Sequence, residues 1–151
     1  SGQLVSPDIV SLGSVWKFSD TDGDLGTSWR EPAYDDSLWS SGAAPLGYGS
    51  IRDNETGENH PIATSANRRY GQPTTYFRQS FEVSNPSSFL DLNLSMRVDG
   101  GVIVYLNGRE VFRDANLVGE IDYSSEPIND ASDSNEGDRD VYSIDLSALV
   151  E

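Results

Sequence analysis

The chain has 151 residues, of which 36% are apolar and 10% aromatic, a composition that suits a single folded domain and excludes a disordered chain. Its 25 acidic residues against 10 basic ones give a formal net charge of −15, which disfavours nucleic acid and anionic membrane surfaces as partners. It has no cysteine, which excludes disulfides and thiolate metal sites, and no apolar run long enough for membrane insertion.

The first predicted element is a strand at residues 14–20, where Trp16 and Phe18 share one face of an alternating pattern. Three carboxylates follow at alternate positions: Asp20, Asp22 and Asp24. Together with Glu31, at the twelfth place, they have the spacing of the ligands in a helix-loop-helix calcium site. The strand before this loop and Pro32 after it exclude the two flanking helices. The loop is therefore either a calcium site that follows a strand or a solvated turn.

The next segment carries adjacent carboxylates but gives no indication of catalysis. Asp35-Asp36-Ser37 is typical of a turn that caps a short helical segment, and chance pairs of acids are expected in so acidic a chain. The single histidine, His60, lies in a long loop of a chain without cysteine, so neither a zinc triad nor a Ser-His-Asp set is indicated. We expect no enzymatic activity.

A long segment without a strand pattern follows, at residues 49–73, and loops of that length in compact domains are usually functional or disordered. Sugars are bound by aromatic rings on their C–H faces and by planar polar groups on their hydroxyls. Five residues in or beside this segment have those chemistries: Tyr48, Arg52, Arg68, Arg69 and Tyr70. We predict that they bind a glycan weakly, with Arg69 and Tyr70 as the main contacts.

The remaining predicted elements are strands. Three segments alternate apolar and polar residues in the manner of half-buried strands: 74–83, 90–98 and 141–146. In the first of them we expect Phe77 on the apolar face and Arg78 on the opposite one. Residues 101–112 are expected to form a hairpin, because Asn107-Gly108 favours a type I′ turn. Short antiparallel strands separated by such turns predict a sandwich or a barrel.

Three stretches of the sequence carry a family resemblance: VWKFSDTDGDLGTSWREPAYDDSLWSSGAAPLGYG at 15–49, TTYFRQSFEV at 74–83 and MRVDGGVIVYLNGREVFRDANL at 96–117. They resemble the jelly-roll domains of the galactose-binding-like superfamily in large secreted bacterial proteins. Such domains sit beside polysaccharide-active enzymes, metallophosphoesterases and surface proteins. The resemblance covers most of the chain and implies an all-β sandwich of about eight antiparallel strands, forming one domain over residues 1–151.

The resemblance also implies a calcium ion. It matches three carboxylates to the loop that holds calcium in many relatives: Asp20, Asp22 and Asp24. A carboxylate near the end of the domain completes the site in those relatives, and the candidates here are Glu126, Asp133 and Glu136. Relatives have one more strand after the segment that matches 145–150. We therefore expect an open C-terminal edge that a strand-donating segment fills, while nearby acids oppose self-pairing.

These observations predict a non-catalytic carbohydrate-binding module of a secreted or cell-surface bacterial protein, stabilised by calcium and joined to other domains of a larger parent. The alternative is a structural or adhesive spacer domain that makes protein-protein or domain-domain contacts and binds no sugar. Exposed aromatic rings beside convergent polar groups in residues 49–73 would favour the first function. A large exposed apolar patch would favour the second.

Overall fold

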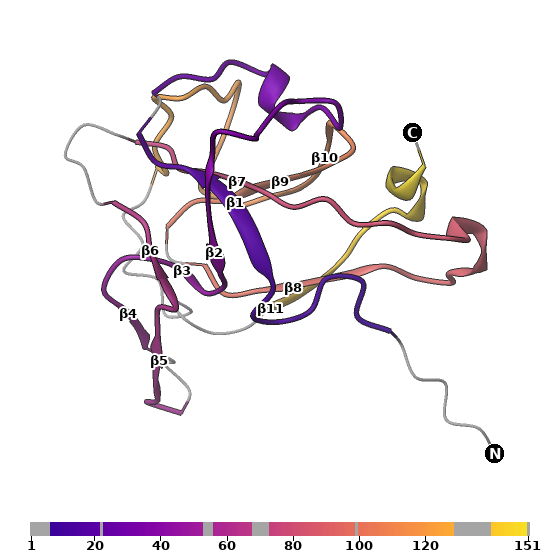
Figure 1. The fold of residues 1–151 in the computed structure, drawn as a ribbon, viewed down its shortest axis with the longest axis horizontal. Helices are drawn as coiled ribbons and strands as arrows, with labels where there is room; N and C mark the ends of the chain where they lie inside the picture. The colour runs from indigo at the N-terminus through magenta and orange to yellow at the C-terminus, as the bar shows by residue number, and fades with distance from the viewer. Residues whose placement is uncertain are drawn as a thin grey trace.

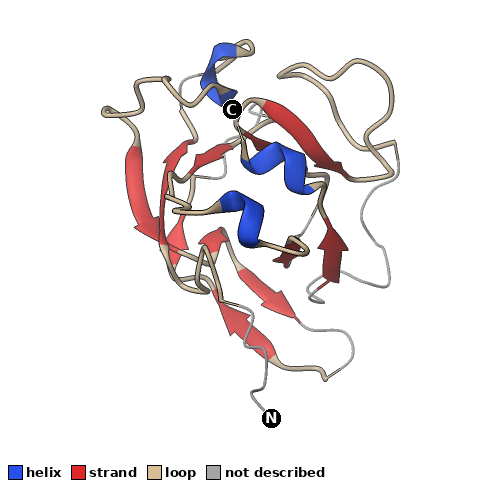
Figure 2. Ribbon diagram, turned by 90° about the vertical axis from the view of Figure 1, so that its right-hand side faces the viewer, coloured by secondary structure: helices blue, strands red, loops and turns tan. Residues whose placement is uncertain are grey.

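The computed structural model describes residues 7–21, 23–52, 56–67, 73–98, 100–128 and 140–150. Within these ranges the chain is predominantly β, and its helical segments are single 3-10 turns (Figure 1). Figure 2, which faces the right-hand side of Figure 1, shows 3-10 turns on the near side of the strands. The expectation of an all-β chain with several antiparallel strand pairs is confirmed.

The strands have these bounds: β1 Val15–Ser19, β2 Ser40–Ala43, β3 Leu46–Gly47, β4 Ser50–Arg52, β5 Asn59–Pro61, β6 Thr64–Ser65, β7 Tyr76–Arg78, β8 Asn93–Met96, β9 Ile103–Leu106, β10 Arg109–Arg113 and β11 Asp140–Ser143. The 3-10 turns are η1 Ser28–Arg30, η2 Pro86–Ser88 and η3 Leu146–Leu149.

The central sheet places β1 between β2 and β7, with both neighbours antiparallel to it. The expected first strand is thus confirmed, and Phe18 on it is buried at 6% exposure. β2 and β6 lie so close together that only glycine fits at position 42: a Cβ there would lie 2.2 Å from Cγ2 of Thr64. The Thr64 hydroxyl also donates a hydrogen bond to the carbonyl of Ala43, at 2.8 Å. These contacts hold β6 against β2, at the edge of the central sheet.

Two further antiparallel pairs come from the second half of the chain. β9 and β10 form the expected hairpin, and Asn107 (φ 50°) and Gly108 (φ 77°) both have the positive φ of a type I′ turn. β8 pairs with β11, so that Leu94 lies opposite Tyr142. Among the described residues neither of these two strands pairs with another one. The expected strand addition at the C-terminal edge therefore stays a prediction.

The segment 49–73 differs from the expectation of a patternless loop. It contains β4 and β5, which form an antiparallel ribbon, and β6, which pairs in parallel with β3. These strands have two or three residues each, too few for an alternating pattern to be visible in the sequence. The β4–β5 ribbon projects from the body of the molecule at the lower left of Figure 1.

The core is built on aromatic side chains around β7. Tyr76 is 5% exposed, and its ring centroid lies 4.9 Å from that of Trp29 and 6.4 Å from that of Trp39. The predicted facing of this strand is wrong: Phe77 is 38% exposed, whereas the Arg78 side chain is only 11% exposed. Arg78 turns inward because the Asp36 carboxylate and two backbone carbonyls accept hydrogen bonds from its guanidinium there.

Candidate functional site

The acidic loop begins where β1 ends, and its first carboxylate is buried. Asp20 is 5% exposed, and its Oδ2 accepts a hydrogen bond from the backbone N–H of Asn67 at 2.6 Å. Asp24 is exposed, and its Oδ1 accepts from the N–H of Gly26 at 2.8 Å. Asp22 lies outside the described residues. The loop is thus anchored at its start to the segment after β6 and bends tightly at Asp24.

The buried carboxylate of Asp20 suits a calcium ligand. Burying an anionic oxygen costs free energy unless a donor or a cation compensates, and calcium takes carboxylate oxygens. Within the described ranges no group of three or more His, Cys, Asp or Glu side chains gathers in a metal-holding arrangement. This finding does not test the predicted calcium ligands, because one of them, Asp22, lies outside the described residues. Of the late candidates, Glu126 is exposed, and Asp133 and Glu136 lie outside the described residues.

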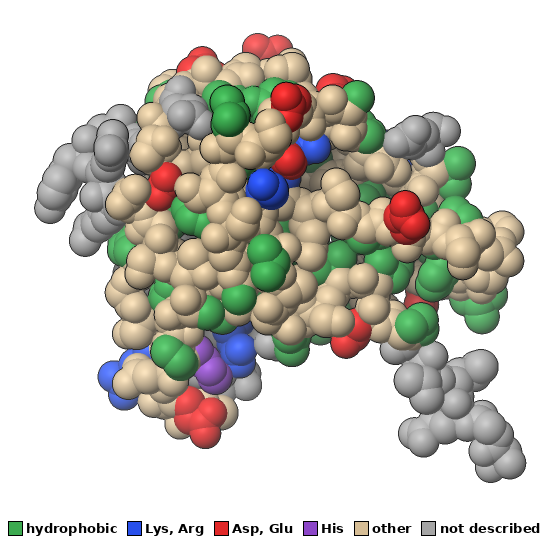
Figure 3. Space-filling view, in the orientation of Figure 1, with side chains coloured by type: hydrophobic (Ala, Val, Ile, Leu, Met, Phe, Trp, Pro, Cys, Tyr) green, Lys and Arg blue, Asp and Glu red, His purple; other side chains and the backbone are tan. Residues whose placement is uncertain are grey.

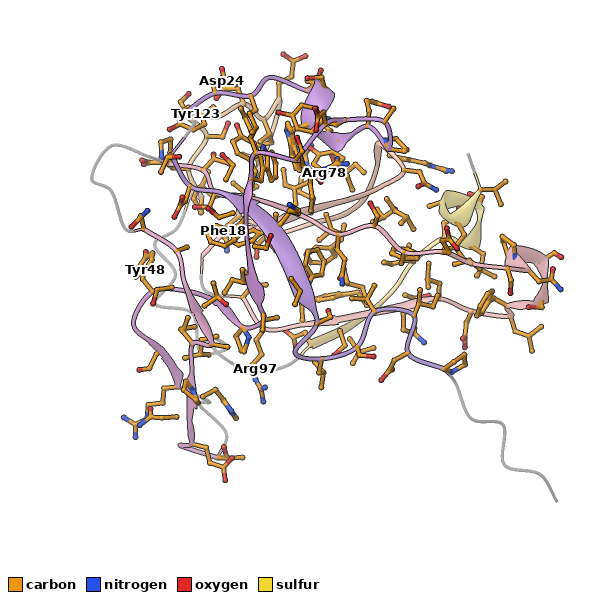
Figure 4. All side chains as sticks on the ribbon, in the orientation of Figure 1. Phe18, Asp24, Tyr48, Arg78, Arg97 and Tyr123 are labelled. Carbon is orange, nitrogen blue, oxygen red and sulfur yellow. The ribbon has the colours of Figure 1, made fainter. Side chains whose placement is uncertain are left out.

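Near Asp24 the loop meets the aromatic core. The Leu25 N–H donates to the Tyr76 hydroxyl at 3.4 Å, and the Tyr123 ring stacks on Tyr76 with centroids 6.4 Å apart. Asp24 and Tyr123 lie beside each other at the top of Figure 4. Burial, followed by the charge of Asp24, raises the pKa of Tyr76 above its ordinary value of 10.0.

Two of the five predicted sugar contacts lie among the described residues. Tyr48 is 57% exposed and occupies the left edge of Figure 4, between β3 and β4. Arg52 ends β4 on the projecting ribbon and is exposed. The other three lie outside the described residues: Arg68, Arg69 and Tyr70. His60 is half-buried within β5, so its expected place in an exposed loop is wrong.

Arg52 differs from the other described arginines. Arg30 lies over the ring of Tyr105, with its Cζ 4.4 Å from the centroid, and Arg97 also has an interaction. Three more bind carboxylates: Arg78 with Asp36, Arg109 with Asp145, and Arg113 with Glu110. In the part of the chain that the structure describes, the guanidinium of Arg52 makes no hydrogen bond, ion pair or ring contact. Its charge is therefore available to a molecule outside the chain.

Sequence reasoning missed one residue of this surface, Asn59, which lies directly opposite Arg52 in the ribbon. The sequence does carry a turn signal before it, namely Gly57. In the structure this glycine has a φ of 73°, and the Glu58 N–H donates to the Thr56 hydroxyl at 3.3 Å. That signal indicates a turn before Asn59, but the partner across the ribbon depends on the strand register.

Comparison of the chain with protein-family models, with curated proteins and with solved structures finds no match in any of the three. Within the described residues, no helix has the length and apolar character needed to cross a bilayer.

Proposed function

We propose that this chain is a non-catalytic carbohydrate-binding module with a jelly-roll sandwich of the galactose-binding-like kind, part of a secreted or cell-surface bacterial protein. The observation that carries the proposal is the exposed ring of Tyr48, 57% accessible, at the base of the ribbon that bears Arg52. An aromatic ring offers its face to the C–H surface of a sugar, and a guanidinium donates to the hydroxyls around it.

The arrangement supports binding rather than catalysis. Hydrolysis of a glycosidic bond usually needs two carboxyl groups placed to act on the same bond. Around Tyr48 and Arg52, the described residues 46–52 and 56–65 contribute hydroxyl, amide, imidazole and guanidinium groups and a single carboxylate, that of Glu58. Groups of this kind hold a sugar without supplying an acid and a base.

Replacing Tyr48 by alanine is expected to weaken binding of a polysaccharide at least about fivefold, because the aromatic contact contributes about 1 kcal/mol beyond its buried area. Titration calorimetry against neutral and acidic polysaccharides measures the effect. The matched control is Leu38→Ala, which removes a side chain that is 97% exposed on another segment. Wild-type protein that binds no polysaccharide in the series contradicts the proposed function, and unchanged binding by Tyr48→Ala places the site elsewhere.

Calcium binding by Asp20, Asp22 and Asp24 is the second part of the proposal, supported by the burial of Asp20. An ion bound only to the folded chain is expected to stabilise it by about 2.7 kcal/mol at a hundredfold excess over its Kd. Thermal melting in calcium and in chelator measures this difference. Asp20→Asn keeps an oxygen for the Asn67 N–H but removes the charge, so its two melting curves should coincide.

The control for that experiment is Asp91→Asn, which changes an exposed carboxylate outside the loop and should leave the calcium response intact. Coincident melting curves for the wild-type protein would remove calcium from the proposal. They would leave sugar binding untouched, because Tyr48 and Arg52 lie on a different segment from the acidic loop.

A structural or adhesive spacer is the alternative function, and exposed apolar side chains favour it. Leu38 and Leu90 are 97% and 91% exposed, and Figure 3 shows hydrophobic side chains gathered at the right-hand end of the molecule. Apolar surface of this kind marks contacts with other domains or proteins. A strand donated to the edge of β11 would be one such contact. The calorimetric series separates the two functions, since a spacer binds no sugar.

A further inference from the structure

The β4–β5 ribbon has two unlike faces. Arg52 lies opposite Asn59, and Ile51 lies opposite His60. Directly opposed residues of an antiparallel pair have Cβ atoms about 4.5–5.5 Å apart and point to the same side. The face with Arg52 and Asn59 is exposed, whereas Ile51 and His60 are half-buried. The ribbon therefore presents a guanidinium and a carboxamide side by side to solvent.

Both polar groups on that face lack a partner within the described residues. The Asn59 carboxamide, like the Arg52 guanidinium, makes no hydrogen bond to another described side chain or backbone group. The chain has 25 acidic residues, and every other described arginine has found an interaction. An exposed arginine with no partner among the described residues costs the folded chain little, because water solvates it. It is also ready to donate to a ligand without first breaking an internal contact.

We propose that Arg52 and Asn59 act together on adjacent hydroxyl groups of a neutral sugar, with Tyr48 against the sugar's C–H face. This inference rests on the proposed function and adds Asn59 and the class of ligand to it. A guanidinium has donors only, whereas a carboxamide has both donors and an acceptor. Two neighbouring sugar hydroxyls match this pair, because one can accept from Arg52 while the next donates to the Asn59 oxygen.

The charge of the chain decides between neutral and acidic sugars. A net charge of −15 repels a polyanion at long range, and the exposed Glu58 stands directly before Asn59. Among the described residues of the ribbon, the single guanidinium of Arg52 beside this carboxylate does not create a cationic surface on which an acidic polymer would accumulate. An uncharged hydroxyl pair feels no such repulsion and gains the same hydrogen bonds. The site is therefore suited to neutral hexose polymers.

Titration calorimetry with a neutral β-glucan, a neutral galactomannan and polygalacturonate tests the inference. Asn59→Ala and Arg52→Lys are each expected to weaken binding of the neutral polymer about fivefold to tenfold. The first loses a hydrogen-bonding amide, and the second keeps the charge but loses the planar fork of donors. Asn93→Ala is the control, because it removes an exposed carboxamide from β8, outside the ribbon, and should bind like the wild type.

Wild-type protein that binds a neutral polymer better than polygalacturonate, with both variants weakened, supports the inference. Binding of the neutral polymer that is unchanged in Asn59→Ala overturns it, and so does a preference for polygalacturonate. In either of those cases the proposed function stands, since a polysaccharide is still bound. Absence of binding to all three polymers overturns the inference and the proposed function together. Circular dichroism of each variant shows that lost binding is not lost folding.

Discussion

Replacing Arg78 by alanine is expected to lower the free energy of unfolding by about 3 kcal/mol, because it removes the donor from the partly buried carboxylate of Asp36 and from two backbone carbonyls, one of them partly buried. Its Nε donates to Oδ2 of Asp36 at 2.9 Å, and its side chain is 11% exposed against 25% for Asp36. Its Nη1 donates to the carbonyls of Trp29 and Glu31. The guanidinium also lies over the Tyr34 ring, with Cζ 5.3 Å from the centroid.

These contacts tie β7 to the segment around η1, which supplies Trp29 to the aromatic core. Arg78→Lys separates geometry from charge: lysine keeps the charge but has no planar fork to reach three acceptors, so most of the loss should remain. Urea unfolding followed by tryptophan fluorescence measures both variants. Arg109→Ala is the matched control, because its pair with Asp145 is 3.9 Å long, its hydrogen bond to Ser147 is exposed and its side chain is 57% exposed, so its loss should stay below about 1 kcal/mol. Equal losses in Arg78→Ala and Arg109→Ala would contradict the role of Arg78.

The sequence predicts best those parts of the fold that depend on neighbouring residues. The hairpin of β9 and β10 follows from Asn107-Gly108, because only residues that tolerate a positive φ suit its turn. The alternating pattern of β1 likewise identifies Phe18 as a buried residue. The Asp35 carboxylate accepts from the Ser37 N–H at 3.0 Å, as its turn sequence indicates, although the short helical segment expected after it does not form among residues 35–39. In each case the residues that decide the structure are at most four positions apart.

Features that depend on distant partners escaped prediction. An alternating pattern assigns a charged residue to the wet face, and so it placed Arg78 outside. Arg78 lies inside because Asp36, 42 positions away, provides a charged acceptor for it. Burial of an arginine is favourable only when such partners exist, and a single sequence does not reveal them. The same limit hid the ribbon of β4 and β5, since its strands are recognisable only by their pairing.

The residues of the candidate site also differ in whether the sequence alone could identify them. Tyr48 and Arg52 could be chosen by chemistry alone, because aromatic rings and guanidinium groups suit sugars wherever they are exposed. Asn59 could not, because its importance comes from lying opposite Arg52 in the ribbon. The burial of Asp20 was equally invisible, since it follows from contact with Asn67, 47 positions away. Residue chemistry thus leads to the proposed class of ligand, and the strand register decides which side chains would meet it.

The raised pKa of Tyr76 should make the stability of the fold decrease at high pH. Burial raises this pKa above 10.0, so the phenol stays protonated in the folded chain at pH values where the unfolded chain ionises. The stabilisation is fully present below the unfolded pKa and is lost as the pH rises through the folded one. Loss of stability at high pH should therefore be smaller in Tyr76→Phe, which has no ionisable group at this position.

Replacing Tyr76 by alanine is expected to cost about 3–5 kcal/mol of unfolding free energy, the range for removing a large aromatic side chain from a core. Tyr76 is 5% exposed and contacts three other rings, those of Trp29, Trp39 and Tyr123. Removing it leaves a cavity among side chains from three separate segments, which the short strands around it have little means to fill. Thermal and urea unfolding measure the loss, and near-ultraviolet circular dichroism reports the packing of the remaining rings.

Two variants show whether the loss comes from the ring and its position. Tyr76→Phe keeps the ring and loses only the long 3.4 Å hydrogen bond from Leu25, so its cost should be at most about 1 kcal/mol. Phe77→Ala removes an aromatic ring from the next position of the same strand, but that ring is 38% exposed and should cost distinctly less than Tyr76→Ala. The order of the two alanine variants is decisive, because the alternating pattern of the sequence favours Phe77 as the inward residue and the fold favours Tyr76. A larger loss for Phe77→Ala would mean that β7 presents its opposite face to the core.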